Sequence, residues 1–150
     1  MSTQLEPLVL LIEDSDEDYA AMQCIVQKGG WNLVLHRVAT ADDALDFLCR
    51  RGAHEATTTE RPALILLDLN LPGMDGRELL VEIKADANLK SIPVVVLSTS
   101  KNPRDITVCY RSGVNSYQIK QVSYEKFFQS MQSLFAYWLH TATLPSGAQP

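Results

Sequence analysis

The segment Leu64-Ile-Leu-Leu-Asp-Leu-Asn-Leu-Pro-Gly-Met-Asp-Gly76 decides the fold of this chain. Its first four residues are aliphatic and stop at Asp68, which is typical of a strand that is buried on both faces. A proline and a glycine then form a turn, and the final Asp-Gly pair can cap the start of a helix. The segment therefore predicts a strand, a turn and a helix in succession.

Similar aliphatic runs recur along the chain, and each ends at polar side chains. Two runs are strong, Leu8–Ile12 and Pro93–Leu97, whereas Asn32–Val38 and Ser116–Ile119 are weaker strand patterns. Runs that are apolar on both alternating faces suit a parallel sheet covered by helices on each side. With the strand that ends at Asp68, the sequence predicts five strands.

Helical patterns separate these strands, and each begins at a residue that can cap it. The expected starts are Asp14 or Ser15, Thr40, Asp75, Asn102 before Pro103, and Ser123; the first helix reaches about Lys28, the fourth closes at Gly113 and the last continues to about His140. Because strands and helices alternate strictly, the crossovers are right-handed and helices cover both faces. The expected fold class is α/β: a doubly wound five-stranded parallel sheet with the flavodoxin-like strand order 2-1-3-4-5.

Length and composition indicate one folded domain. The chain has 150 residues, of which 46% are hydrophobic and 21% charged, and this excludes a disordered protein. We expect the domain to span residues 8–140, between a flexible N-terminus at residues 1–7 and a partly disordered C-terminal extension at residues 141–150. We expect residues 51–62 to form an unusually long polar loop.

Charge and cysteine usage exclude several classes of protein. The net charge is −5 and no dense Lys/Arg run occurs, so nucleic acid is not an expected partner. The N-terminal apolar run is too short for a signal peptide or a membrane span. Cys24, Cys49 and Cys109 are scattered singly and are predicted to be reduced thiols. A cytoplasmic protein is expected.

Acidic residues follow two of the predicted strands. Glu13 and Asp14 come after the first strand and Asp68 ends the third, and these strands are neighbours in the expected order. Mutual repulsion of three carboxylates is tolerated if a hard cation such as Mg²⁺ sits among them, and the backbone carbonyl of Asn70 could complete its shell. Alternatively, Asp14 merely caps a helix and Asp68 starts a turn.

The sequence resembles the response-regulator receiver domains of two-component phosphorelay signalling. The resemblance runs from Leu8 to Leu139, nearly the whole chain. It rests on an ordered set of motifs: the pair Glu13-Asp14, Asp68 with the loop Leu71–Gly76, then Ser98, Tyr117 and Lys120. Three longer segments, Leu66–Pro72, Pro93–Ser100 and Tyr137–Pro145, are similar to the small regulators paired with cyanobacterial phytochromes.

The resemblance implies a phosphoacceptor and a metal site. Asp68 would accept a phosphoryl group from a sensor histidine kinase, the implied partner. Mg²⁺ would be held by Asp14, Asp68 and the Asn70 carbonyl, with Glu13 reached through water. The protein would then be a signalling protein rather than an enzyme. It would act without an output domain, either by docking to a downstream protein or by passing its phosphoryl group onward, and the sequence does not identify the recipient.

The resemblance also implies a switch. Lys120 would contact a phosphoryl oxygen, and Ser98 would donate its hydroxyl to the phosphoryl group. Tyr117 would fill the space that the serine leaves, while Pro72 and Gly76 shape the loop behind the acceptor. Considered one at a time, Lys120 would be interpreted as a surface charge, Ser98 as a turn residue and Tyr117 as a half-buried residue of a strand.

One position departs from the family pattern. Receiver domains commonly have a cis proline after the lysine, whereas Gln121 follows Lys120 here. A cis bond before a residue other than proline costs about 2.5–4 kcal/mol, so we expect a trans bond and a different local loop. Asn70 and Ser100, at the expected entrance of the site, would tune dephosphorylation.

Two other functions are alternatives to the phosphorelay hypothesis. An aspartate-nucleophile phosphatase would need a general acid two residues after the nucleophile, where this chain has Asn70, and an amide cannot transfer that proton. A receiver-like docking module that is never phosphorylated would not need the complete set of acidic residues, Glu13, Asp14 and Asp68, or Lys120. The sequence leaves both alternatives open.

The last predicted helix carries a wide apolar stripe. Its members are Phe127, Phe128, Met131, Leu134, Phe135, Trp138 and Leu139, with Tyr124 and Tyr137 beside them. A core-facing helix explains most of the stripe. The aromatic surplus supports a second hypothesis, a homodimer formed through this helix and its extension Thr143-Leu144-Pro145.

Overall fold

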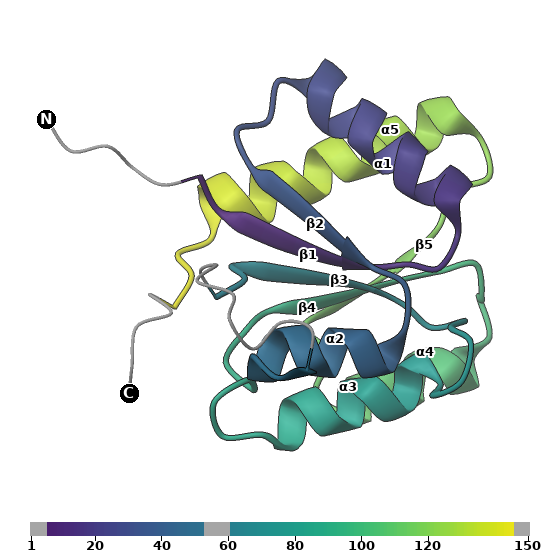
Figure 1. The fold of residues 1–150 in the computed structure, drawn as a ribbon. Helices are drawn as coiled ribbons and strands as arrows, with labels where there is room; N and C mark the ends of the chain where they lie inside the picture. Colours follow the sequence, from purple (N-terminus) through teal and green to yellow (C-terminus); the bar gives the residue numbers. More distant parts are fainter. Residues whose placement is uncertain (1–5, 53–60, 146–150) are drawn as a thin grey trace, which may run out of the picture.

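Five parallel strands form one sheet in the order β2-β1-β3-β4-β5, as expected from the sequence (Figure 1). The strands are β1 (Leu8–Ile12), β2 (Val34–Val38), β3 (Leu64–Asp68), β4 (Val94–Ser98) and β5 (Ser116–Ile119). A computed structural model provides the coordinates, and it describes residues 6–52 and 61–145.

Helices cover both faces of the sheet (Figure 1). On one face lie α1 (Asp16–Gly29) and α5 (Tyr124–Phe135), which continues into a π-helical segment, η2 (Ala136–Thr141). On the other face lie α2 (Ala41–Cys49), α3 (Gly76–Ala85) and α4 (Pro103–Arg111). The doubly wound α/β architecture predicted from the alternating pattern is confirmed.

The predicted caps begin the helices. The side chains of Ser15, Thr40, Asp75, Asn102 and Ser123 each accept a hydrogen bond from a backbone N–H in the first turn of their helix. Each bond satisfies one of the amide donors that a helix start leaves unpaired. The loop residues that precede the helices, at the edge of the sheet where the strands end, are therefore held in place.

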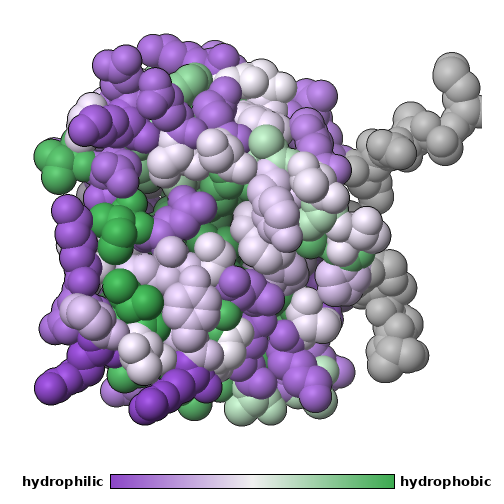
Figure 2. Space-filling model, turned by 180° about the vertical axis from the view of Figure 1, so that it is seen from behind, coloured by the Kyte–Doolittle hydropathy of each residue, from purple (hydrophilic) through white to green (hydrophobic). Residues whose placement is uncertain are grey.

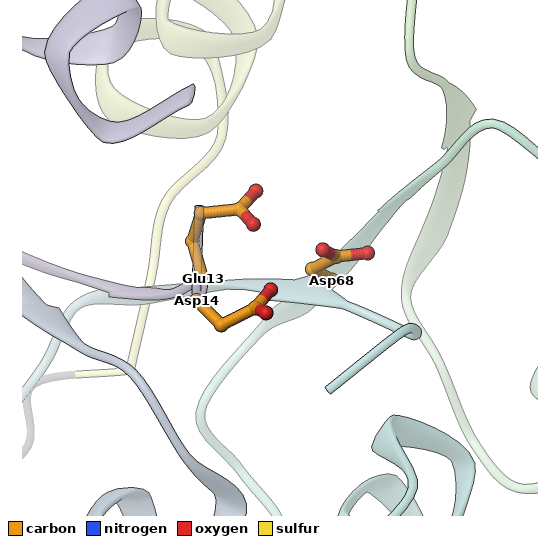
Figure 3. A group of neighbouring side chains, drawn as sticks. All are labelled: Glu13, Asp14 and Asp68. Atoms are coloured by element: carbon orange, nitrogen blue, oxygen red, sulfur yellow. The ribbon is translucent and has the colours of Figure 1, made fainter. Parts of the chain in front are cut away.

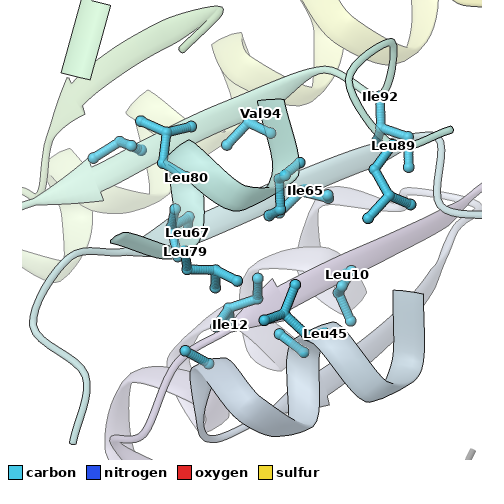
Figure 4. Packing of buried hydrophobic residues seen from close by; sticks show 14 of the residues in the cluster. Leu10, Ile12, Leu45, Ile65, Leu67, Leu79, Leu80, Leu89, Ile92 and Val94 are labelled. Carbon is cyan, nitrogen blue, oxygen red and sulfur yellow. The ribbon is translucent and has the colours of Figure 1, made fainter. Parts of the chain in front are cut away.

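Strand alternation divides the core into two clusters. Leu8, Leu10 and Ile12 of β1 face α2 and α3, while Val9 and Leu11 face α1 and α5. The same alternation holds in β3 and β4, and the side chains of the first cluster interlock between the sheet and its helices (Figure 4). Because β1, β3 and β4 are buried along their whole length, the sheet holds its edge rigidly.

In two places the structure departs from the predicted elements by more than one residue. The second strand begins at Val34 rather than Asn32, because pairing with β1 starts at Leu8 opposite Val34. The last helix is not one regular α-helix to His140: α5 ends at Phe135 and the chain continues as a π-helix to Thr141. A π-helix keeps the chain coiled, so the apolar pattern alone did not reveal the change of pitch.

Parts of three predicted segments lie outside the described residues. They are the N-terminus at residues 1–5, the loop at residues 53–60 and the tail at residues 146–150. Within the described ranges, no helix is both long enough and apolar enough to span a membrane. Cys24, Cys49 and Cys109 are free thiols, as predicted.

Helix α3 starts in direct contact with the end of β3. The backbone N–H of Gly76 donates to the carbonyl oxygen of Leu69 at 3.0 Å. A Cβ atom at position 76 would lie 2.6 Å from the Asp68 carbonyl oxygen and 2.6 Å from the Leu69 Cα. Only glycine permits this approach, so the position of α3 is tied to the residue that ends β3.

Replacement of Gly76 by alanine tests this contact. The added methyl group would meet backbone atoms that cannot rotate away, so we expect Gly76→Ala to lower the free energy of unfolding by about 1–3 kcal/mol. Urea denaturation followed by circular dichroism measures the change. Glu82→Ala, on the exposed face of the same helix, should stay within about 0.5 kcal/mol of the parent. Equal stability of Gly76→Ala and the parent would contradict the close approach.

Candidate functional site

Three carboxylates converge where β1 and β3 end (Figure 3). Ile12 pairs with Leu67 in the sheet register, so the residues that follow, Glu13 and Asp68, lie side by side. One carboxylate oxygen from each of Glu13, Asp14 and Asp68 lies within 4.8 Å of the other two. The structure thus brings together the acidic residues that the sequence singled out.

The three carboxylates differ in exposure. Glu13 and Asp68 are 3% and 8% exposed, whereas Asp14 is exposed. The Asp68 Oδ1 accepts a hydrogen bond from the backbone N–H of Asn70 at 3.2 Å. This bond holds the start of the following loop close to the Asp68 side chain. A set of oxygen donors with one member open to solvent suits a hard divalent cation that keeps part of its hydration shell.

Lys120, just beyond β5, brings a positive charge to this cluster. Its Nζ lies 2.8 Å from Glu13 Oε1, 2.9 Å from Asp18 Oδ2 and 3.8 Å from Asp68 Oδ2. Its backbone N–H donates to the Ser98 carbonyl at 2.7 Å, which fixes the start of the side chain relative to β4. Two of the ammonium's three donors are therefore engaged by Glu13 and Asp18, and Asp68 lies within ion-pair distance.

Burial and charge shift the pKa values of this pair. Burial raises the pKa of Glu13 to about 7, although the hydrogen bond and charge of Lys120 act in the opposite direction. For Lys120, burial lowers the pKa, but its hydrogen bonds to Glu13 and Asp18 and the charge of Asp68 outweigh burial and raise it to about 12. The lysine therefore stays charged at neutral pH, while Glu13 is easily protonated without a metal.

Ser98 and Tyr117 meet through Ser100. Ser98 is 1% exposed, and its Oγ accepts a hydrogen bond from the backbone N–H of Ser100 at 3.1 Å. The Tyr117 hydroxyl donates to the carbonyl oxygen of the same Ser100 at 2.8 Å. The two predicted switch residues are thus connected by opposite sides of one residue in the loop between β4 and α4.

Ser100 also connects this loop to two helices. Its Oγ donates to Asp105 Oδ2 of α4 at 2.6 Å, and Asp105 Oδ1 lies 3.0 Å from Nη2 of Arg77 in α3. Arg77 is paired in turn with Asp75, the cap of α3. The sequence placed Ser100 at the site entrance, but it did not predict the connection to Asp105 and Arg77, which depends on side-chain directions between two separate helices.

Two further residues of the site were missed by sequence reasoning. Asp18, in the first turn of α1, contacts Lys120, and Arg37, near the end of β2, contacts the backbone of Glu13 and Asp14. A charged residue near the end of a strand was the only available signal for Arg37. Asp18 gave no separate signal, because acidic residues are common in the first turn of a helix.

Of the predicted loop residues, Gly76 contacts the backbone at the end of β3, as described above. Pro72 is exposed, and Gly73 has a positive φ of 75°. Among the described residues no peptide bond is cis, so the bond between Lys120 and Gln121 is trans, as expected for a residue other than proline.

Comparison with known proteins identifies relatives along nearly the whole chain. A family model described as the response regulator receiver domain matches residues 9–132. The response regulator Rcp1 of Synechocystis sp. is 41% identical over 150 residues, covering 97% of this chain and 99% of the relative.

Solved structures agree with this match. The crystal structure of the phosphorylated cyanobacterial phytochrome response regulator RcpA is similar with a TM-score of 0.88 and 41% identity, over 94% of this chain and 99% of that chain. The Mn²⁺-bound form of Rcp1 has a TM-score of 0.86 and 41% identity, over 93% and 99% of the two chains.

The raised pKa of Glu13 predicts a pH dependence of stability in the metal-free protein. The unfolded chain loses this proton near pH 4.5 and the folded chain near pH 7, so the folded state binds more protons between these values. The free energy of unfolding should therefore fall as pH rises through this window, by up to about 3 kcal/mol. Thermal unfolding in EDTA, recorded from pH 5 to 7.5, measures the effect.

Two variants make this measurement specific. Glu13→Gln removes the titrating group and should flatten the dependence. Glu17→Gln, at an exposed position of α1, should leave the dependence unchanged. An equally steep fall in Glu13→Gln would show that another group is responsible.

Proposed function

The chain belongs to the response regulator receiver family, and from this premise we propose that Asp68 accepts a phosphoryl group from a sensor histidine kinase. The observation that carries the proposal is the position of Asp68, close to the carboxylates of Glu13 and Asp14 and within ion-pair distance of the Lys120 ammonium group. This arrangement supplies a carboxylate nucleophile together with the charges that a transferring phosphoryl group requires.

The proposed reaction exchanges one bond to phosphorus for another. An Asp68 carboxylate oxygen attacks the phosphorus of a phosphohistidine, the P–N bond breaks, and the histidine nitrogen takes up a proton. The product is an acyl phosphate on Asp68. Lys120, whose pKa is raised to about 12, stays charged and contacts a phosphoryl oxygen from the side on which it now faces Asp68.

We propose Mg²⁺ as the cofactor of this transfer. Asp14, Asp68 and the backbone carbonyl of Asn70 would hold the ion, with Glu13 reached through water. Bound Mg²⁺ neutralises charge on phosphoryl oxygens. The all-oxygen donor set supports this assignment, and a relative of similar structure has been crystallised in an Mn²⁺-bound form.

We propose that the phosphoryl group is sensed through Ser98 and Tyr117. To donate its hydroxyl to a phosphoryl oxygen, Ser98 reorients the group that now accepts from Ser100. Tyr117 bonds the carbonyl oxygen of the same residue, so a shift of Ser100 changes the position of the tyrosine as well. The change in surface then follows from one loop that both residues share.

The kinase partner is proposed to be of the phytochrome type. RcpA is a cyanobacterial phytochrome response regulator, and its similarity to this chain extends over nearly the full length of both. A cytoplasmic location is a prediction that rests on the three scattered cysteines, all of which are free thiols.

Incubation with acetyl phosphate and Mg²⁺, followed by intact mass measurement, tests the phosphoacceptor. We expect one adduct of about 80 Da, the mass of one phosphoryl group. The adduct should be absent in Asp68→Asn and retained in Asp42→Asn, a control at an exposed aspartate of α2. Asp14→Ala should slow its formation, because that variant lacks a proposed metal ligand.

Other outcomes support the competing functions. No adduct at any magnesium concentration, with acetyl phosphate or a phosphorylated kinase, would favour a docking module that is not phosphorylated. Sustained hydrolysis of small phosphate esters would favour a phosphatase, although Asn70 occupies the place of the general acid that such an enzyme needs.

We also propose that the protein forms a homodimer through α5 and its extension. Most of the apolar stripe packs into the core: Phe127, Met131, Leu134 and Phe135 are buried, and Phe128, Trp138 and Leu139 pack against the same cluster. Tyr124 and Tyr137 remain exposed at 45% and 52%. Figure 2 shows the molecule from behind, where hydrophobic and weakly polar residues alternate with hydrophilic ones around a shallow hollow. Exposed tyrosines of this kind suit a protein interface.

Light scattering over a concentration series tests the dimer. We expect twice the monomer mass at high micromolar concentration and a shift toward monomer in Tyr137→Glu, which places a charge within the proposed interface. Val81→Glu, at a similarly exposed hydrophobic residue of α3, is the matched control and should leave the mass unchanged. A monomer at all concentrations, with Asp68 phosphorylated or not, would rule out the dimer.

A further inference from the structure

Arg37 contacts the backbone of the acidic pair rather than its carboxylates. Its Nε donates to the carbonyl oxygen of Glu13 at 2.6 Å, and its Nη2 donates to the carbonyl oxygen of Asp14 at 2.9 Å. The same Nη2 lies 2.9 Å from Oδ1 of Asp16, in the first turn of α1. One planar guanidinium thus holds the loop that joins β1 to α1 at two carbonyl groups and the start of α1 at one carboxylate.

The sheet places Arg37 where this contact is possible. Arg37 pairs with Leu11 in the register of β1 and β2, on the face covered by α1. Its side chain is 18% exposed, and its guanidinium carbon lies 5.2 Å from the centre of the Tyr19 ring. On the other side, the backbone N–H of Glu13 donates to the Val38 carbonyl at 3.0 Å. The planar guanidinium of Arg37 and the hydrogen bond from Glu13 to Val38 together fix the peptide units on both sides of Glu13.

We propose that Arg37 is a positioning residue for the cation site formed by Glu13, Asp14 and Asp68. The inference rests on the proposed function, because it takes that site to bind Mg²⁺. Two carbonyls held in fixed directions determine where the Cα–Cβ bonds of residues 13 and 14 point. Glu13 is thereby directed inward to Lys120, and Asp14 is directed across the opening toward Asp68.

A positioning role and a purely electrostatic role of Arg37 predict opposite results. A positive charge close to the acids repels a second cation, so removal of the charge alone would strengthen Mg²⁺ binding. Loss of the carbonyl contacts would instead free the loop and weaken Mg²⁺ binding, because removal of contacts just outside the metal ligands generally lowers metal affinity. The sign of the change therefore separates the two roles.

Calorimetric titration with Mg²⁺ alone, without any phosphodonor, tests the proposal. We expect Arg37→Gln to weaken Mg²⁺ binding about tenfold. Arg37→Lys keeps the charge but loses the two-pronged geometry, so it should weaken binding to a similar extent. Asp16→Asn removes the ion pair and leaves both carbonyl contacts, and it should stay within about twofold of the parent.

The NMR spectrum of the metal-free protein gives a readout that does not depend on Mg²⁺ binding. In both Arg37 variants, the largest changes in backbone amide chemical shifts should fall at residues 13–16. Thermal unfolding in EDTA identifies a temperature at which each variant is folded, and the titrations are made there. If Arg37→Gln is unfolded at every usable temperature, Arg37→Lys carries the test.

Two results would overturn the proposal. Arg37 variants that bind Mg²⁺ as tightly as the parent, or more tightly, would reduce Arg37 to a structural or electrostatic contact. In that case a parent protein that still binds Mg²⁺ and forms the Asp68 adduct leaves the proposed function intact. A parent protein that binds no Mg²⁺ would remove both the metal site and the role of Arg37.

Discussion

Repulsion among three carboxylates is the constraint on which the rest of the site depends. At separations of up to 4.8 Å, each pair costs about 3 kcal/mol at an effective dielectric constant near 20. Lys120 offsets part of this cost through Glu13 and Asp68, but it also pairs with Asp18, and one ammonium cannot balance all of these carboxylates. The fold bears the remainder because β1 and β3 are buried along their whole length and cannot spread apart.

The same edge of the sheet also holds a set of connected polar groups around Ser100. Ser100 contacts Ser98 through its N–H, Tyr117 through its carbonyl, and Asp105 through its hydroxyl. Because Asp105 is paired with Arg77, the loop after β4 is connected to the first turns of both α3 and α4. A movement of one serine therefore reaches two helices through hydrogen bonds and an ion pair, without any change in the sheet.

Much of the fold could be predicted because burial on both faces leaves a clear pattern. The runs in β1, β3 and β4 were located to within one residue, and the capping side chains marked each helix start. The approach of Glu13 and Asp68 followed from strand order alone. Arg37 and Asp105 could not be predicted in the same way, because their contacts depend on rotamers of long side chains from separate elements. The π-helical turn after Phe135 was missed because its residues continue the same apolar pattern.

The contact between Gly76 and the end of β3 limits which parts of the chain could adjust if Asp68 were modified. Helix α3 begins against the carbonyl oxygen of Asp68, so it has no room to approach further. Gly73, by contrast, has open space around it and a left-handed backbone conformation. Any crowding at Asp68 would therefore be taken up by the short connection at residues 70–74 rather than by a shift of α3 toward the sheet.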